Sequence, residues 1–151
     1  MSGSGQPPRE SRAPDGPRWH IWVLVSSCIH SGVWSLFIIL APETSARVYG
    51  FASTPVEVHL WQGTGFFIGL LAFGYALAAA NPRQHWGLVL FGLIAKTAGA
   101  VGMTRAVWLG QVSRNVLTLI PINDVIWWLP FFLIVRHYRQ VTRGRQAPTH
   151  V

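Results

Sequence analysis

Four long hydrophobic runs divide the chain, and each has the length of a membrane-spanning helix. They cover about residues 19–40, 59–80, 86–109 and 115–135. About 20 apolar residues in a helix cross the ~30 Å hydrocarbon layer of a bilayer. The pattern therefore predicts an all-α fold, a four-transmembrane-helix bundle with up-down topology.

Capping and turn residues mark where these helices begin and end. Thr54, Pro55 and Glu57 predict a helix start with a capping box ahead of the second run. Residues 81–85, NPRQH, predict the end of that helix and a short connection to the next one. Residues 41–54 are expected to form the longest internal loop.

The last run contains two prolines, Pro121 and Pro130. Proline removes a helical hydrogen bond and clashes with the preceding turn, so this helix is expected to be kinked or partly unwound. Backbone groups freed at membrane depth must be satisfied by other helices or by water. An alternative interpretation starts the regular helix at Pro121 and extends it past the membrane to Tyr138.

Both ends of the chain differ in composition from the runs between them. Residues 1–18 are rich in Pro, Gly, Ser and Arg and are expected to be disordered. The run that follows is too long for a signal peptide and lacks a clear cleavage site. Residues 139–151 form a basic tail. Residues 19–138 are therefore predicted to be one membrane domain.

Composition indicates a membrane protein whose main partner is the lipid bilayer. Half of the residues are hydrophobic and 11% are charged, against about 25% in soluble domains. The net charge is +7, but no basic face with interleaved aromatic residues lies outside the runs. The sequence therefore argues against nucleic-acid binding.

The arginines of the tails and connections predict the orientation of the chain. Eight fall on the side of the two tails and the second connection: Arg9, Arg12, Arg18, Arg83, Arg136, Arg139, Arg143 and Arg145. Three fall on the other side: Arg47, Arg105 and Arg114. Because the cytoplasmic side carries the excess of Lys and Arg, both termini are predicted to be cytoplasmic.

Several kinds of site are excluded by the residues present. Cys28 is the sole cysteine, which excludes an internal disulfide, a CxxC redox pair and a cysteine-rich metal centre. A cysteine inside an apolar run acts as a small core residue with little thiolate. No nucleotide loop, HExxH or GxSxG motif occurs. The sequence thus predicts no catalytic group, no metal and no cofactor.

Ionisable residues interrupt three of the runs at nearly the same predicted depth. At about 1.5 Å per residue, His30, Lys96 and Asp124 lie roughly 15 to 16 Å from the cytoplasmic ends of their helices. Asn123 precedes Asp124. Intramembrane ionisable residues are energetically costly and are candidates for a functional site. The sequence therefore predicts a polar cluster of Lys96, Asp124, Asn123 and His30 near the middle of the bilayer.

Two interpretations of this polar cluster remain open. Lys96 and Asp124 could form an ion pair that braces two helices, because pairing reduces the cost of a buried charge. The cluster could instead line a polar pocket for a ligand. His30 could equally be a hydrogen-bonded core residue, and Asn123 could satisfy backbone groups that the prolines expose.

Aromatic residues near the polar cluster offer another candidate feature. Trp127 and Trp128 lie too deep for an interfacial aromatic belt, roughly 10 to 12 Å from the cytoplasmic end of their helix. Together with Tyr75 they are candidates for the wall of a site for a flat ligand such as a quinone. Packing within the bundle is the alternative role.

Several stretches carry a resemblance to a known group of proteins. They are Trp61-Gln62-Gly63, residues 74–82, His85-Trp86, residues 92–96 and the Asn-Asp-x-x-Trp-Trp-x-Pro-Phe element at 123–131. Over about residues 20–136 the chain resembles uncharacterised small bacterial four-span membrane proteins, sometimes labelled alkyl hydroperoxide reductase. The layout is also similar to DoxX-type membrane proteins.

The resemblance implies a four-helix bundle in the bacterial inner membrane and supplies no mechanism. Lys96 and the element at 123–131 are its most specific parts. Peroxide reductase chemistry needs a reactive, accessible thiolate. Cys28, inside an apolar run, does not support it.

Three hypotheses for the function follow. In the first, the protein is an inner-membrane protein whose polar cluster binds a small or lipidic ligand or braces an assembly. In the second, it is an accessory subunit of a larger membrane complex, as a homo-oligomer or with a partner subunit, since small residues form stripes on its helices. In the third, it is a membrane-embedded enzyme of quinone or lipid redox chemistry, without an identified catalytic residue.

Overall fold

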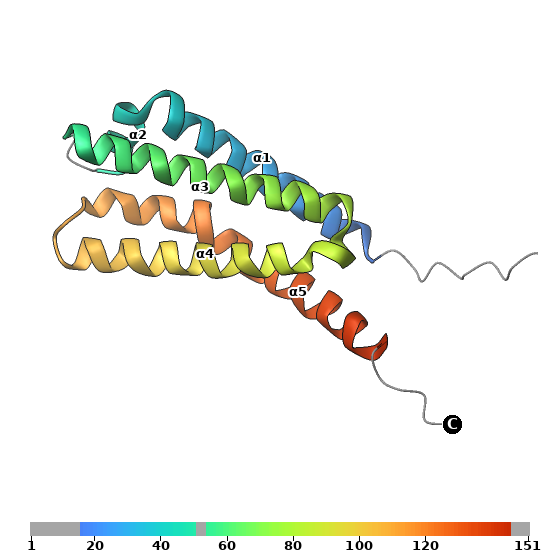
Figure 1. Cartoon of the computed structure of the whole chain (residues 1–151). Helices are drawn as coiled ribbons and strands as arrows, with labels where there is room; N and C mark the ends of the chain where they lie inside the picture. The colour runs from blue at the N-terminus through green and yellow to red at the C-terminus, as the bar shows by residue number, and fades with distance from the viewer. Residues whose placement is uncertain (1–15, 51–53, 146–151) are drawn as a thin grey trace, which may run out of the picture.

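The computed structural model of the protein describes residues 16–50 and 54–145. Within these ranges every regular element is a helix, as the hydrophobic pattern predicts. The elements are α1 (Arg18–Leu40), α2 (Pro42–Val48), α3 (Pro55–Ala80), α4 (Pro82–Trp108), η1 (Arg114–Thr118), η2 (Pro121–Val125) and α5 (Ile126–Arg145) (Figure 1). The disorder predicted for residues 1–18 falls mainly on residues 1–15, which lie outside the described ranges.

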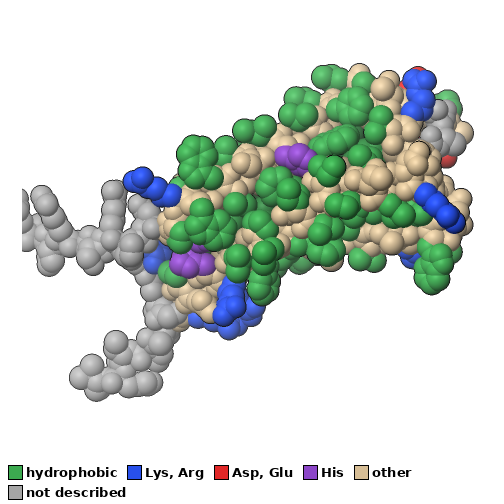
Figure 2. All heavy atoms as spheres, turned by 180° about the vertical axis from the view of Figure 1, so that it is seen from behind, with side chains coloured by type: hydrophobic (Ala, Val, Ile, Leu, Met, Phe, Trp, Pro, Cys, Tyr) green, Lys and Arg blue, Asp and Glu red, His purple; other side chains and the backbone are tan. Residues whose placement is uncertain are grey.

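Among the described residues, four helical segments are long and apolar enough to cross a membrane: Arg18–Leu40, Pro55–Ala80, Pro82–Trp108 and Arg114–Arg143. Large apolar side chains cover their outer faces, and Trp22, Leu60, Phe73 and Leu129 are each more than half exposed. Figure 2 shows hydrophobic side chains along the length of the molecule and Lys and Arg side chains near its ends. This distribution is typical of a surface that faces lipid.

Helices α1 and α3 pack closely, because small residues of α3 face α1. Ser35 Oγ donates a hydrogen bond to the main-chain oxygen of Gly65 at 2.8 Å. A Cβ atom at Gly65 would lie 2.7 Å from Ile38 Cγ2, and one at Gly69 would lie 2.7 Å from Ser35 Oγ. The GxxxG spacing of these glycines therefore brings two backbones together.

The predicted loop at residues 41–54 contains a helix instead. Pro42 occupies the first turn of α2, Glu43 lies in that turn and Arg47 lies in the last one. Proline is compatible with a first turn. An acidic side chain near the start of a helix and a basic one near its end interact favourably with the helix dipole. Short-range helix signals therefore outweighed the loop-like composition of the segment.

The two ends of α3 are formed by the residues predicted for them. Thr54 N and Thr54 Oγ1 lie 2.9 and 2.8 Å from Glu57 Oε2, and the capping box is complete. Asn81 alone separates α3 from α4, and its side chain accepts a hydrogen bond from the main-chain N–H of Gln84. The connection predicted at 81–85 is thus largely helical, with a kink at His85.

The last hydrophobic run is irregular, as its prolines predict. It begins with the 3-10 helix η1, continues through the π-helical turn η2 and becomes α-helical at Ile126. Pro130 lies inside α5 without ending it. Helix α5 continues to Arg145, so it starts and ends later than the alternative from Pro121 to Tyr138 predicts.

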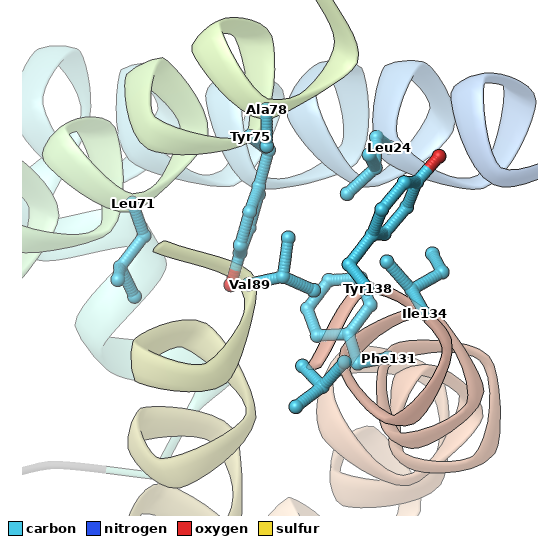
Figure 3. Packing of buried hydrophobic residues seen from close by; sticks show 9 residues of the cluster. Leu24, Leu71, Tyr75, Ala78, Val89, Phe131, Ile134 and Tyr138 are labelled. Carbon is cyan, nitrogen blue, oxygen red and sulfur yellow. The ribbon is translucent and has the colours of Figure 1, made fainter. Parts of the chain in front are cut away.

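The four long helices share an apolar core near one end of the bundle. Leu24 of α1, Tyr75 of α3, Val89 of α4, and Phe131 and Ile134 of α5 are all fully buried (Figure 3). The ring centroids of Tyr75 and Phe131 lie 5.0 Å apart. This core fixes the helices on one side of the polar cluster.

A second apolar core lies around α2 and includes Ile38, Tyr49, Trp61 and Val116. Trp61 Nε1 donates a hydrogen bond to Ser45 Oγ at 2.9 Å, which ties α3 to α2. The rings of Tyr49 and Trp61 lie 4.8 Å apart. The space between the two cores contains the candidate site.

Candidate functional site

The structure brings Lys96, Asn123 and Asp124 together where α4 meets η2. Lys96 Nζ donates a hydrogen bond to the main-chain oxygen of Asn123 at 2.6 Å and lies 3.5 Å from Asp124 Oδ1. Only 11% of the Lys96 side chain and 22% of the Asp124 side chain are exposed. A buried ammonium is stabilised by an acceptor and by a counter-charge, and Lys96 has both.

The π-helical turn supplies the main-chain acceptor. In η2 the N–H of Ile126 donates a hydrogen bond to the main-chain oxygen of Pro121, five residues earlier. In an α-helix the acceptor would be the oxygen four residues earlier. The wider turn alters the pairing of the neighbouring carbonyls, and the oxygen of Asn123 accepts from Lys96. Such turns occur frequently at functional sites.

Asn123 connects this turn to the segment that joins α1 and α3. Its Nδ2 donates a hydrogen bond to Tyr49 Oη at 2.6 Å. Tyr49 is the C-cap residue of α2 and is 8% exposed. Burial raises the pKa of the Tyr49 phenol and nearby Asp124 adds to the rise, so the hydroxyl keeps its proton.

His30 is hydrogen-bonded within its own helix. Trp34 Nε1 donates to His30 Nε2 at 3.2 Å, and the ring of Trp127 lies 5.5 Å from the imidazole ring. His30 Nδ1 is buried and has no hydrogen-bond partner among the described residues. His30 therefore has the core-residue geometry considered from sequence, with one nitrogen unused.

A cavity of about 480 Å³ lies beside these residues, within the ~300 to 1,000 Å³ typical of small-molecule sites. His30, Lys96, Asn123 and Asp124 all contribute to its lining. Most other lining side chains are apolar or aromatic: Trp34, Tyr49, Trp61, Phe67, Ile68, Leu71, Phe91, Ile94, Ala95, Ala98, Met103, Val116, Leu119 and Ile120. The cavity thus combines a polar region with an extended apolar surface.

The mouth of the cavity lies between α3 and α4. The exposed members of its lining come from these two helices and are Thr64, Phe67, Phe91, Ile94, Ala98 and Gly99. The rings of Phe67 and Phe91 meet edge to face at the mouth, with centroids 6.2 Å apart. The cavity therefore opens onto the apolar outer surface of the bundle.

The three residues considered as a ligand wall are placed elsewhere. Tyr75 lies in the core against Phe131 (Figure 3), and Trp127 also packs against that core. None of Tyr75, Trp127 and Trp128 is among the described residues that line the cavity. Aromatic walls are instead supplied by Trp34, Tyr49 and Trp61 and by the two phenylalanines of the mouth, none of which the sequence analysis proposed as a ligand wall.

The described residues contain no group of three or more His, Cys, Asp and Glu side chains that could hold a metal ion. Glu57 is engaged in the capping box of α3. Cys28 is partly buried on α1 and packs against the apolar core. In the described part of the chain, Glu57 is therefore engaged in helix capping and Cys28 in apolar packing.

Comparison with family models, curated proteins and solved structures finds no match to this chain. The geometry and chemistry of the cavity are therefore the basis for a function.

Proposed function

We propose that the protein is a multi-pass protein of the bacterial inner membrane that binds a small lipidic molecule in the cavity beside Lys96. The observation that carries the proposal is the form of the cavity: polar groups in one region, apolar walls, and a mouth between α3 and α4. A molecule with a polar head and an apolar tail matches this distribution.

The proposed arrangement in the membrane is up-down, with both termini in the cytoplasm. The eight arginines of the tails and the second connection, against three on the other side, support this orientation. In this arrangement the mouth of the cavity faces the hydrocarbon of the bilayer. A lipid would then reach the site sideways, without crossing water.

Binding is favoured over catalysis by the way the charged groups are engaged. Lys96 is held by Asn123 and Asp124, within 2.6 and 3.5 Å. A general acid or base must exchange protons with a substrate, whereas these two groups neutralise each other. A fixed, neutralised pair suits a recognition element.

Native mass spectrometry of the protein released from bilayer nanodiscs, followed by lipid extraction, tests the proposal. Gly99→Leu places a side chain at the mouth, and a Cβ atom there meets nothing within 4 Å, so we expect the variant to fold. Gly102→Leu is the matched control, because Gly102 lies on the same helix, is equally open and is not part of the lining.

The wild type and Gly102→Leu should retain a lipidic molecule that Gly99→Leu loses. Equal retention by all three proteins would overturn the proposal. A wild-type chain that retains no lipid but co-purifies in a defined stoichiometry with another membrane protein would favour the role of accessory subunit.

A further inference from the structure

We infer that the outer surface of α5 binds an anionic phospholipid. The surface is formed by Leu129, Phe132, Arg136, Arg139 and Arg143, and is called the α5 face. None of these residues lines the cavity, so the inference adds a second site to the protein. Three observations carry it: an apolar and a basic stretch share one face, their junction lies at the level of interfacial tryptophan, and the described chain offers these arginines no carboxylate.

The α5 face changes from apolar to basic along the helix. Leu129 and Phe132 are exposed, and so are Arg136, Arg139 and Arg143. Successive members are three or four positions apart in sequence, which keeps them on one side of an α-helix. One surface therefore presents apolar side chains first and guanidinium groups next.

The opposite side of α5 is fixed against the bundle. Phe131, Ile134 and Tyr138 are buried in the apolar core. Tyr138 Oη lies 3.4 Å from Nδ1 of His20 on α1, and the rings of His20 and His137 lie 5.0 Å apart. The last turns of α5 leave the bundle obliquely (Figure 1). Packing thus sets the direction in which the α5 face points.

The junction of the apolar and basic stretches lies at the level expected for lipid phosphate. Trp19 is an exposed indole at the start of α1, and such residues mark the membrane interface. Its ring lies 4.2 Å from that of His20, which contacts His137 of α5. Arg136 precedes His137, and Phe132 lies about 7 Å deeper along the helix. The arginines therefore begin where the apolar layer of a bilayer would end.

The arginines of the α5 face have no carboxylate partner in the described chain. The described acidic residues are Glu43, Glu57 and Asp124. Glu43 and Glu57 lie at the starts of α2 and α3, at the other end of the bundle (Figure 1), and Asp124 pairs with Lys96. Figure 2 shows Lys and Arg side chains at the end from which both tails emerge. An external anion is the counter-charge that fits this end.

A phospholipid matches both parts of the α5 face. Guanidinium groups bind phosphate through paired, charge-assisted hydrogen bonds, and basic residues beside a span attract anionic head groups. Acyl chains would lie along Leu129 and Phe132 while the phosphate meets Arg136 and Arg139. A soluble phosphate compound would use the arginines alone and leave the apolar stretch without a role, so the lipid is favoured.

The test uses the full chain in nanodiscs of phosphatidylcholine that contain a low mole fraction of phosphatidylglycerol with the same acyl chains. Native mass spectrometry counts each lipid that the released protein retains. Preference is the ratio of the two retained lipids, divided by their ratio in the nanodisc. The two leaflets of a nanodisc have the same composition, so the orientation of the chain does not affect the result.

Three variants address the charge. Arg136→Gln/Arg139→Gln/Arg143→Gln neutralises the α5 face, and Arg136→Lys/Arg139→Lys/Arg143→Lys keeps its charge. The matched control removes the same charge from exposed arginines elsewhere in the described chain and is Arg47→Gln/Arg105→Gln/Arg114→Gln.

The wild type and the matched control should prefer phosphatidylglycerol about tenfold or more, and the glutamine variant of the α5 face should lose most of this preference. The lysine variant should keep the preference within about threefold of the wild type, because its charge remains. Equal losses in the glutamine and lysine variants would show a structural effect and overturn the inference. Equal losses in the α5 variant and the matched control would also overturn it.

Two further outcomes identify a different site. Displacement of phosphatidylglycerol by millimolar inorganic phosphate at constant ionic strength would indicate a site for a soluble anion and overturn the lipid assignment. Loss of the preference in Gly99→Leu but not in Gly102→Leu would place the anionic lipid in the cavity, and the α5 face would then have no such role.

Discussion

Lys96 Nζ is hydrogen-bonded to the main-chain oxygen of Asn123 at 2.6 Å, closer than to its counter-ion. The nearest oxygen of Asp124 lies at 3.5 Å. Hydrogen bonds with a charged donor are strong at short distance. The main chain of the π-turn therefore holds the ammonium, and the carboxylate balances its charge.

Removal of Lys96 should cost more stability than removal of the Asp124 charge. Lys96→Met loses both contacts and leaves Asp124 without its cation, with an expected loss of about 2 to 4 kcal/mol in the free energy of unfolding. Asp124→Asn keeps the bond from Lys96 to the main chain and should cost about half as much. Unfolding in mixed micelles measures both.

The double variant Lys96→Met/Asp124→Asn completes the cycle. It should cost less than the sum of the two single changes, because neither partner remains as an unpaired charge. A larger loss for Asp124→Asn than for Lys96→Met would show that the carboxylate is the principal partner. A double variant with wild-type stability and unchanged lipid retention would show that Lys96 and Asp124 contribute neither to folding nor to the site.

Alanine substitutions on α3 should separate close packing from helix propensity. Gly65→Ala and Gly69→Ala place a methyl group 2.7 Å from atoms of α1, so each should lower the free energy of unfolding by about 1 to 3 kcal/mol. Gly63→Ala is the control on the same helix, since nothing lies within 4 Å of its Cβ position. It should raise stability by up to ~1 kcal/mol, and equal effects at all three sites would contradict the packing of α1 on α3.

Tyr75→Phe should leave the fold and the ligand unaffected. The Tyr75 side chain is fully buried, and its hydroxyl has no hydrogen-bond partner among the described residues. Removal of an unsatisfied hydroxyl should leave stability unchanged or raise it by about 1 kcal/mol. Lipid retention should equal that of the wild type because Tyr75 lies outside the lining of the cavity. Reduced retention would instead support Tyr75 as part of the ligand wall that the sequence predicted.

Tyr49 should make stability fall at high pH. Its pKa is raised in the folded protein by burial and by Asp124, so the unfolded chain ionises first. The stabilisation that this shift contributes is complete below about pH 10, the pKa of tyrosine in the unfolded chain. It is lost as the pH rises above that value. Tyr49→Phe should lose about 1 kcal/mol at neutral pH with its bond to Asn123, and its stability should decline less steeply above that pH. An unchanged slope would contradict the raised pKa.

Uniform helix geometry allowed much of the site to be predicted. Counting residues from each helix end placed His30, Lys96 and Asp124 at one level, because the rise of an α-helix is constant. In the structure Lys96 contacts Asp124, and His30 borders the same cavity. The helix ends at Thr54 and Asn81 could also be predicted from the sequence, because capping depends on residues close in sequence.

Tertiary packing explains what the sequence did not reveal. Tyr49 lies within a segment with loop-like composition, and its contact with Asn123 depends on how α2 packs on α3. Trp127 and Trp128 follow the π-turn, and one extra residue in a turn rotates the helix that follows by about 100°. A regular periodicity therefore could not predict which way these indoles face, and the cavity depends on the relative positions of α3 and α4.

The position of the mouth between α3 and α4 determines whether a ligand enters from the bilayer or from water. For a chain embedded in a bilayer, a lipid would exchange one hydrocarbon environment for another, so hydrophobic burial contributes little to its affinity. Selectivity then depends on shape and on the few polar groups of the lining. Affinity at such a site is a dissociation constant expressed as a mole fraction of the ligand in the membrane, and its aqueous concentration does not enter it.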